Sequence, residues 1–598
     1  MPPYKKFERF LSQPDGNGKR IKLSRSNSLQ HVTPCGKIAI VGVGSRGLTI
    51  LERLTAIYDE QLHYYELDIY LIDPGRYHGQ GVHSSEQSDN LLINTVACQV
   101  TMFGDESVLN CGPMRKGPSL FEWAKNINNE QCKGREIKEN DYLSRALLGK
   151  YLKWCHDELV NNLPKGIRVH HYYETVNDLQ RLNDGRLKLF LANDCTLYVD
   201  CAILTTGHGQ NSLDNEENIY TKFVEECCSI NPHLNYFRSY PLNQLQSIDK
   251  HAKIAIQGLG LSCHDVLSEL TCGRGGHFLF DENDELTYMP SGNEPEKIYV
   301  YSRNCLPYSA RGMNEKGVGG QYQARFFTRA AIDDLREKSG CFQLDFEKQL
   351  MPILIHEMCY VYECTLNEHW IEPPTKFQPS YETLQVIHRL MYPLHDVHFT
   401  SYDLFSSWII QFVEHDLDEA YRGNIHSPVK AATDVLRDVR DTIRYAVDYR
   451  GLTPESHRSF IQNICPIMNR IAVGPPKERN QELLALLRAG VVEFACGPHA
   501  QVKCQREKAC FEISTLSRQV DVDVLVKGMI ETFYPKRDNS NLIRNMLKRG
   551  LIRSFFNGDY HPGGIDINKN QNPITTTGVP VRNLWALGNI VEGPNFYT

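Results

Sequence analysis

Residues 37–58, KIAIVGVGSRGLTILERLTAIY, decide the fold class, because they combine a short apolar strand, a glycine turn and an amphipathic helix. Gly42, Gly44 and Gly47 stand in the turn with the spacing G-x-G-x-x-G. The first glycine permits the tight turn, the second lets the backbone approach a diphosphate, and the third lets helix and strand pack closely. Amides and the dipole at the helix N-terminus favour the same phosphate charge. The stretch therefore predicts a nucleotide-binding turn within a β-α-β unit.

The strand that follows supports this prediction. It reads ELDIYLID and ends in Asp73, whose carboxylate can accept hydrogen bonds from a ribose hydroxyl. Asp73 lies further from the turn than the usual ~20 residues, and the long intervening helix accounts for the difference. With Ser45 and Arg46 at the start of the helix, these residues form the first predicted cofactor site.

A second strand, turn and helix appear at residues 254–264, IAIQGLGLSCH. Gly258 and Gly260 repeat the first two glycines, and Cys263 takes the place of the third. That third position serves packing, so a small side chain is tolerated there. A tight turn without any ligand is the alternative interpretation.

The strand after the second turn distinguishes the two nicotinamide cofactors. It reads EKIYVYSR and ends in Ser302 and Arg303 instead of an acidic residue. An acid would accept hydrogen bonds from the ribose of NAD and repel a 2′-phosphate, whereas serine and arginine can hold that phosphate by charge-assisted hydrogen bonds. The second turn is therefore predicted to bind NADPH.

The distribution of strands and helices predicts the domain organisation. Alternating strands and helices indicate parallel sheets covered on both faces, and after about residue 320 the apolar spacing becomes helical. Short strands return from about residue 492. We expect a disordered basic tail at 1–35, the first part of one nucleotide-binding domain at 36–215, a second nucleotide-binding domain at 216–320, a helical domain at 321–495, and a C-terminal segment at 496–598 that completes the first domain.

Composition excludes several classes of protein. The 598 residues have a net charge of −7 and show no basic stripe interleaved with aromatic residues, which argues against a nucleic-acid binder. The 19 cysteines contain no Cys-x-x-Cys pair, so we expect reduced thiols and no metal site. No apolar run approaches the ~18 residues that span a bilayer. We expect a cytoplasmic protein, and the basic segment KRIKLSRSNSLQ leaves nuclear or organellar routing open.

Several blocks of the sequence carry a family resemblance. They include IAIVGVGSRGLTILERL, LLINTVACQVTMFGDESV, ILTTGHG, GLGLSCHDVLSELTCGRGG, SRNCLPYSARG and LWALGNIVEG, in this order. The chain resembles the FAD/NAD(P)-binding flavoproteins, a family that includes the FAD-dependent urate hydroxylases and the nitrosuccinate-forming aspartate N-monooxygenases. The resemblance implies an α/β fold with two dinucleotide-binding domains, a Rossmann-like FAD domain and an NADPH domain, plus the helical insertion.

The resemblance also implies which residues hold the cofactors, and Gly588-Asn589 fits the C-terminal turn that closes such FAD sites. The residues expected to bind FAD are Gly42, Gly44, Ser45, Arg46, Gly47, Asp73, Gln99, Gly207, Gly588 and Asn589, and those expected to bind NADPH are Gly258, Gly260, Ser302 and Arg303.

A weaker similarity links the chain to ornithine N-hydroxylases. It rests on Gln99, Phe103, Arg145 and the later YLKW, in the same order, and it implies a nitrogen-bearing substrate. Lys150 departs from the pattern, because an acidic residue is commoner there. In the alternative interpretation, Gln99 and Phe103 only pack beneath the flavin.

The sequence offers three weak candidates for a catalytic side chain. They are Gln99, His208 in TTGHG and Arg311 in PYSARG. In a turn such as TTGHG the backbone can do the work instead of the histidine. Arg311 suits an anionic substrate, and a salt bridge between domains is the alternative.

We therefore expect an FAD- and NADPH-dependent monooxygenase that hydroxylates a small nitrogen-containing substrate through a flavin C4a-hydroperoxide. Its expected partners are a small-molecule substrate and O2, with no nucleic acid and no membrane. Two alternatives stay open: a flavin-dependent NAD(P)H reductase or oxidase without oxygen insertion, and a non-catalytic nucleotide-bound scaffold. The sequence does not indicate an oligomeric state.

Overall fold

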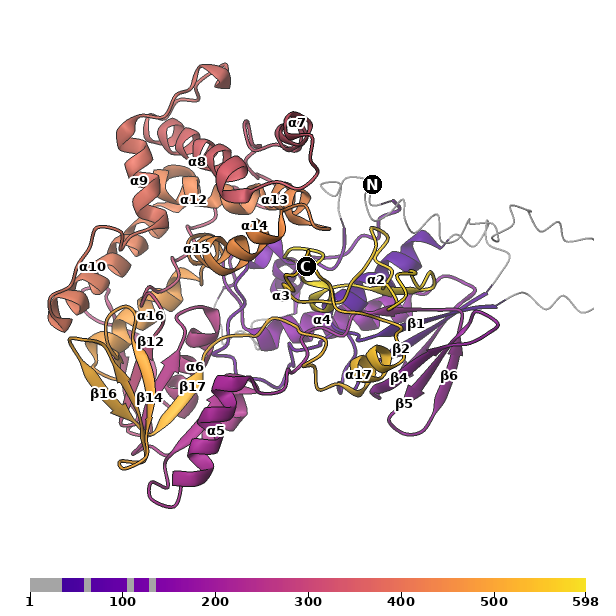
Figure 1. Cartoon of the computed structure of the whole chain (residues 1–598), viewed down its shortest axis with the longest axis horizontal. Helices are drawn as coiled ribbons and strands as arrows, with labels where there is room; N and C mark the ends of the chain where they lie inside the picture. Colours follow the sequence, from indigo (N-terminus) through magenta and orange to yellow (C-terminus); the bar gives the residue numbers. More distant parts are fainter. Residues whose placement is uncertain (1–34, 59–65, 105–111, 128–135, 598) are drawn as a thin grey trace, which may run out of the picture.

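The computed structural model describes residues 35–58, 66–104, 112–127 and 136–597. Residues 1–34 of the predicted basic tail lie outside the described residues, and Cys35 already belongs to the first strand. Two parallel sheets lie towards opposite ends of the long axis, and the helical region lies beside the second sheet (Figure 1). Within the described ranges, no helix has both the length and the apolar character needed to cross a membrane.

The first sheet has five parallel strands in the order β18-β7-β1-β2-β3. Ile38 and Ile40 of β1 share a core with α2 and α4, whereas Ala39 and Val41 share a core with the antiparallel β4-β5-β6 sheet and α17. Because both faces are covered, β1 reads as a continuous apolar run. This half contains β1 (Cys35–Val41), α2 (Ser45–Ile57), β2 (Glu66–Ile72), α3 (Leu120–Asn126), α4 (Arg145–Asn161), β3 (Ile167–Tyr172), β4 (Val176–Arg181), β5 (Leu187–Leu191), β6 (Thr196–Val199), β7 (Cys201–Leu204), α17 (Asn541–Lys548) and β18 (Leu584–Ala586).

The second sheet is also parallel, with the order β13-β12-β9-β17-β8. A hairpin of β10 and β11 and an antiparallel sheet of β14 to β16 accompany it. This half contains α5 (Asn215–Cys227), β8 (Asn235–Arg238), β9 (Lys253–Gln257), α6 (Leu261–Leu270), β10 (His277–Phe280), β11 (Leu286–Met289), β12 (Lys297–Tyr301), β13 (Val492–Phe494), β14 (Gln501–Gln505), β15 (Cys510–Ser514), β16 (Gln519–Val522) and β17 (Val524–Lys527).

The C-terminal segment contributes strands to both sheets. The prediction for residues 496–598 assigns it to the first nucleotide-binding domain alone. β17 pairs in parallel with β8 and β9 in the second sheet, and only β18 joins the first. The four residues of β17, VLVK, are apolar almost throughout. Since any parallel strand buried on both faces has this pattern, the sequence does not say which sheet such a strand joins.

The helical region is joined to the second sheet by a shared core. Phe405 and Ile409 of α10 and Leu483 of α16 pack in one cluster with Phe494 of β13, while α8, α12 and α15 build a separate core. The fold is thus α/β with two parallel sheets and a helical insertion, as predicted. The helices are α7 (Arg329–Ser339), α8 (Met351–Leu366), α9 (Tyr381–Met391), α10 (Tyr402–Tyr421), α11 (Gly423–His426), α12 (Pro428–Asp438), α13 (Arg440–Val447), α14 (Pro454–Ser459), α15 (Cys465–Ala472) and α16 (Lys477–Arg488).

Candidate functional site

The first glycine turn lies at the carboxyl end of the first sheet, between β1 and α2. Gly42 has φ +92°, and a Cβ there would collide with the carbonyl oxygen of Thr205. A Cβ on Gly47 would collide with the carbonyl oxygen of Gly42, which also accepts a 2.5 Å hydrogen bond from the Thr205 hydroxyl. Only glycine therefore fits these two positions, which agrees with the packing roles expected from the spacing.

The starts of α2 and α6 suit an anionic group. Neither helix has a side-chain cap or an acidic residue in its first turn. By contrast, Ser144 caps α4 and Asp214 caps α5. The first amides of a helix need an acceptor, and a diphosphate is an acceptor of the right charge. The residues at both turns therefore fit dinucleotides.

Asp73 holds the first turn in shape. One carboxylate oxygen accepts a hydrogen bond from the Val43 amide and the other from the Gly75 amide, both at 2.7 Å. Gly79 donates to the Val43 carbonyl at 2.7 Å, and Gly81 lies directly against Gly44. Segment 73–81 thus covers the turn. Each carboxylate oxygen keeps a further lone pair, so the predicted contact with ribose stays a prediction.

Residues far apart in sequence meet near this turn. Gly588, which follows β18, has φ +87°, and a Cβ there would lie 2.9 Å from the Arg46 Nε. Asn589 donates a 3.0 Å hydrogen bond to Glu592, and Gly207 follows β7 with φ +71°. Since β1, β2, β7 and β18 are parallel, their carboxyl ends place the predicted FAD residues other than Gln99 at one edge of the sheet, where α/β proteins bind ligands.

The second turn has the same construction. Gly258 has φ +112° and donates to the Tyr301 carbonyl at 2.8 Å, and a Cβ there would lie 2.8 Å from the Gly528 carbonyl oxygen. Cys263 is 2% exposed within α6, so it does occupy a packing position. Sequence reasoning missed Tyr308, whose ring lies 3.2 Å from where a Gly260 Cβ would stand.

Ser302 and Arg303 follow β12 directly, at the carboxyl end of the second sheet. Arg303 is exposed, and its backbone carbonyl accepts a 2.8 Å hydrogen bond from the His499 amide. Its guanidinium has no hydrogen bond or ion pair with any residue in the described ranges. A cation in this position is available to a phosphate.

Gln99 and His208 are two of the three candidates for a catalytic side chain. The Gln99 side chain donates a 2.8 Å hydrogen bond to the Gly317 carbonyl, so it contacts the loop that leaves the second sheet. His208 is exposed in the loop after β7 and makes no side-chain hydrogen bond within the described part of the chain. The structure gives neither residue a catalytic role.

Arg311 lies within a cluster of guanidinium groups. Its Nε donates to the Gly474 carbonyl at 3.2 Å, and among the described residues it makes no salt bridge. Burial, followed by repulsion from Arg437, lowers the pKa of Arg311 to about 10. Tyr142, from the first half of the chain, lies close enough to Arg311 for the two groups to influence each other's pKa.

Two further arginines of this cluster, Arg437 and Arg440, have guanidinium N–H groups without an acceptor among the described residues. Arg437 donates to Asp434 at 3.1 Å, but its Nε is buried without a hydrogen-bond partner. Arg440 has no hydrogen bond or ion pair to another described residue and stacks 5.8 Å from the Tyr597 ring. Burial, then Arg444 and Arg437, lower the pKa of Arg440. The cations repel one another, so an anion would stabilise them.

Known proteins share the sequence over most of its length. The family described as FAD-NAD(P)-binding matches residues 39–209. A nitrosuccinic acid synthase, npaA of Aspergillus oryzae, is 31% identical over 95% of this chain and 90% of its own. A nitrosuccinate-forming L-aspartate N-monooxygenase of Streptomyces davaonensis is 30% identical over 86% of this chain and 85% of its own.

Solved structures of flavin monooxygenases are more loosely similar. The FAD-bound cadaverine monooxygenase DfoA of Erwinia amylovora gives a TM-score of 0.37 at 11% identity, over 94% of this chain and 89% of that chain. An open cyclohexanone monooxygenase gives a TM-score of 0.35 at 12% identity, over 83% and 73%.

The sequence relationships confirm the expected activity and cofactors. The chain is a flavin-dependent monooxygenase with an FAD/NAD(P)-binding domain, and the reductase and scaffold alternatives fall away. It belongs to the family of flavin-dependent N-monooxygenases that includes the nitrosuccinate-forming enzymes.

Proposed function

We propose that the chain hydroxylates the amino group of a small anionic amino acid, with aspartate as the first substrate to test, and that Arg311, Arg437 and Arg440 hold its carboxylate groups. The proposal depends mainly on the guanidinium cluster, in which the Arg437 Nε and the Arg440 side chain have no acceptor within the described residues. The names of the relatives, which include L-aspartate N-monooxygenases, support the same substrate.

Guanidinium groups match carboxylates in both charge and shape. A carboxylate accepts two parallel hydrogen bonds from one arginine, and such pairs are about twice as strong as neutral ones. A substrate with two carboxylates would use more than one arginine. That arrangement orients the amino group, because both ends of the molecule are held.

In this proposal, the two glycine turns hold the cofactors. When bound, FAD and NADPH supply the electrons and the oxygen-activating chemistry. We infer that the first turn, Arg46 and the turn at Gly588 hold FAD, and that Arg46 connects the turn to the cluster, since Arg444 and Glu592 lie near it. We infer that the second turn and Arg303 hold NADPH.

The test compares Arg440→Gln with the wild-type protein. We expect KM for aspartate to rise about tenfold or more, since a hydrogen bond to a charged group contributes about 1.5–3 kcal/mol, while bound flavin is unchanged. The measurement is aspartate-dependent NADPH oxidation together with the mass of the product. Arg389→Gln, an exposed arginine of α9, is the matched control. An unchanged KM in Arg440→Gln, or no hydroxylated product from aspartate, would overturn the proposal.

A further inference from the structure

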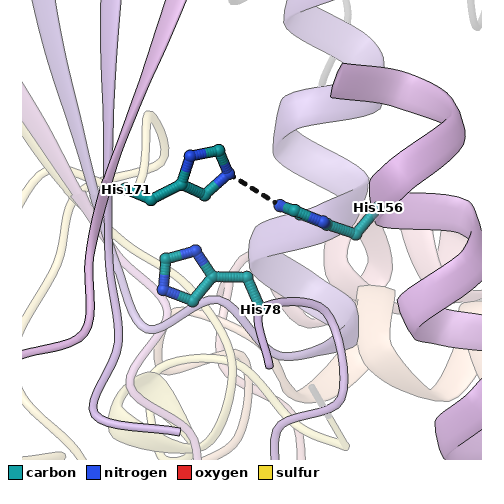
Figure 2. Close-up of side chains that lie close together, drawn as sticks. All are labelled: His78, His156 and His171. Atoms are coloured by element: carbon teal, nitrogen blue, oxygen red, sulfur yellow. Dashed lines mark hydrogen bonds between the residues drawn. The ribbon is translucent and has the colours of Figure 1, made fainter. Parts of the chain in front are cut away.

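Three histidines from three separate elements meet beside the first sheet. His78 belongs to segment 73–81, His156 to α4 and His171 to β3, and their rings point towards one another (Figure 2). The ring centroids of His156 and His171 are 5.2 Å apart, and His78 lies 5.3 Å from His171 and 5.8 Å from His156. One ring nitrogen from each residue lies within 4.8 Å of the other two.

The hydrogen bonding of this cluster is incomplete. His78 is 2% exposed, and neither of its ring nitrogens has a hydrogen-bond partner in the described part of the chain. Leaving a buried polar group unpaired costs about 1–3 kcal/mol. The Nε2 atoms of His156 and His171 share a 3.1 Å hydrogen bond, which one ring donates and the other accepts (Figure 2), so His78 is the ring left without a partner. A shared cation would satisfy all three rings at once.

The surroundings favour neutral rings with free lone pairs. Burial lowers the pKa of His78 to about 4, and it also lowers the pKa of His156 and His171. The Nδ1 of His156 lies 3.0 Å from a carboxylate oxygen of Asp157. A carboxylate in this place accepts a hydrogen bond from Nδ1–H and leaves the Nε2 lone pair for a metal, as beside many zinc sites.

We propose that His78, His156 and His171 bind one zinc ion through one ring nitrogen each, with solvent as the fourth ligand. Zinc takes imidazole nitrogens at about 2.0–2.1 Å, so two nitrogens of a tetrahedral site lie about 3.3 Å apart. The 3.1 Å between His156 and His171 is close to this spacing, and a ring nitrogen of His78 lies within 4.8 Å of both. Zinc fits better than magnesium or calcium, because those ions prefer oxygen ligands.

The other cluster of potential ligands in the described residues does not share these features. Asp214, Glu217 and Glu531 lie together, but Lys527 contacts all three carboxylates at 2.9–3.3 Å. Arg238 also pairs with Glu217 at 2.7 Å. Arg537 lies 3.9 Å from Glu217 and 3.6 Å from Glu531, so three cations face the three carboxylates and that cluster needs no further cation.

The ion would act as a clamp on the first turn. His78 directly precedes Gly79, whose amide donates to Val43 within the turn. A bond from zinc to His78 ties segment 73–81 to β3 and α4, the two elements that supply the other ligands. The expectation of no metal site rests on the cysteine spacing, and these three histidines are widely spaced and follow no ligand motif.

The test measures zinc in the full-length protein. The protein is treated with EDTA, titrated with zinc, freed of unbound ion by gel filtration, and analysed by mass spectrometry for metal. Wild type should retain one zinc ion per chain, and zinc should raise its melting temperature. His171→Gln and His78→Phe should lose both effects; the phenyl ring keeps the stacking on Tyr173, whose centroid lies 4.5 Å from that of His78.

His170→Gln is the matched control, because His170 lies on the same strand and contacts Asp68 at 3.1 Å instead of the cluster. It should bind zinc as the wild type does. Failure of the wild type to bind zinc, or equal binding by His171→Gln, would overturn the proposal. Flavin absorbance and NADPH oxidation, recorded on the same samples, report the proposed enzyme function separately from the metal.

Discussion

Arg303 is the residue from which we expect selection of the nicotinamide cofactor. Its guanidinium is exposed at the end of β12, where the 2′-phosphate of NADPH would lie. Arg303→Ala should raise KM for NADPH by about tenfold or more, since a hydrogen bond to a charged group contributes about 1.5–3 kcal/mol. KM for NADH should change little. Steady-state kinetics with both cofactors measure this, with the exposed neighbour Asn304→Ala as control; equal losses for NADPH and NADH would contradict the assignment.

Asp448 should make the stability depend on pH. Burial raises its pKa to about 7, against the smaller opposing effects of the Phe596 amide and Arg444. The folded protein therefore binds a proton that the unfolded chain has lost, and the contribution of Asp448 to the unfolding free energy falls as pH rises from about 4 to about 7.

Replacing Asp448 by asparagine should remove this dependence. The amide oxygen still accepts the 2.7 Å hydrogen bond from Phe596, and no charge is buried. Asp448→Asn should be more stable than wild type at pH 8 by roughly 1–2 kcal/mol, with no gain at pH 4. Thermal unfolding across this pH range is the measurement. Asp334→Asn, an exposed carboxylate of α7, should show no such change; a gain that is the same at both pH values would contradict the explanation.

At the scale of elements, the second turn shows that the third position of the motif serves packing. Cys263 is buried in α6 and faces the core. Cys263→Gly should leave KM for NADPH unchanged and lower the melting temperature, because glycine within a helix is about 1 kcal/mol less favourable than alanine. Cys227→Gly in α5 should cost similar stability. A large change in NADPH affinity for Cys263→Gly would show that the thiol contacts the cofactor.

The strands, turns and helices that depend on residues close together in the sequence could be predicted. The strand-turn-helix units around Gly42 and Gly258 follow from spacing, and so does their position at the ends of parallel strands. Contacts between distant segments could not be predicted. Tyr308 over the second turn and the meeting of His78 with His171 depend on how the elements pack, and no spacing records that.

At the scale of the whole molecule, an ion pair joins the two halves. Arg145 at the start of α4 donates to both oxygens of Asp265 in α6, at 2.6 and 2.9 Å, and the Tyr240 hydroxyl also donates to Asp265. Arg145 is one of the residues behind the similarity to ornithine N-hydroxylases, and in the structure it makes this connecting contact. The Asp265 side chain is 4% exposed, so its charge depends on these donors.

Asp265→Asn should therefore weaken the contact between the halves. Removing one partner of a buried ion pair costs about 3–5 kcal/mol, and the partly exposed Arg145 places the expected loss at the lower end. Chemical unfolding measures the stability, and the ratio of product to NADPH consumed measures whether the halves still cooperate. Asp184→Asn, part of an exposed pair with Arg186, should behave as wild type. Unchanged stability in Asp265→Asn would contradict this role.

The position of β18 near the C-terminus means that one edge of the first sheet stays unpaired until synthesis is almost finished. β7 ends at Leu204, but its neighbour in the first sheet begins at Leu584. A ribosome that adds about 5–20 residues per second needs roughly 20–80 s to make the chain between them. Throughout that time the growing polypeptide has an exposed sheet edge beside β7, open to wrong pairing. We expect chaperones to bind this edge during synthesis. A nonsense mutation before Leu584 would leave the edge permanently unpaired.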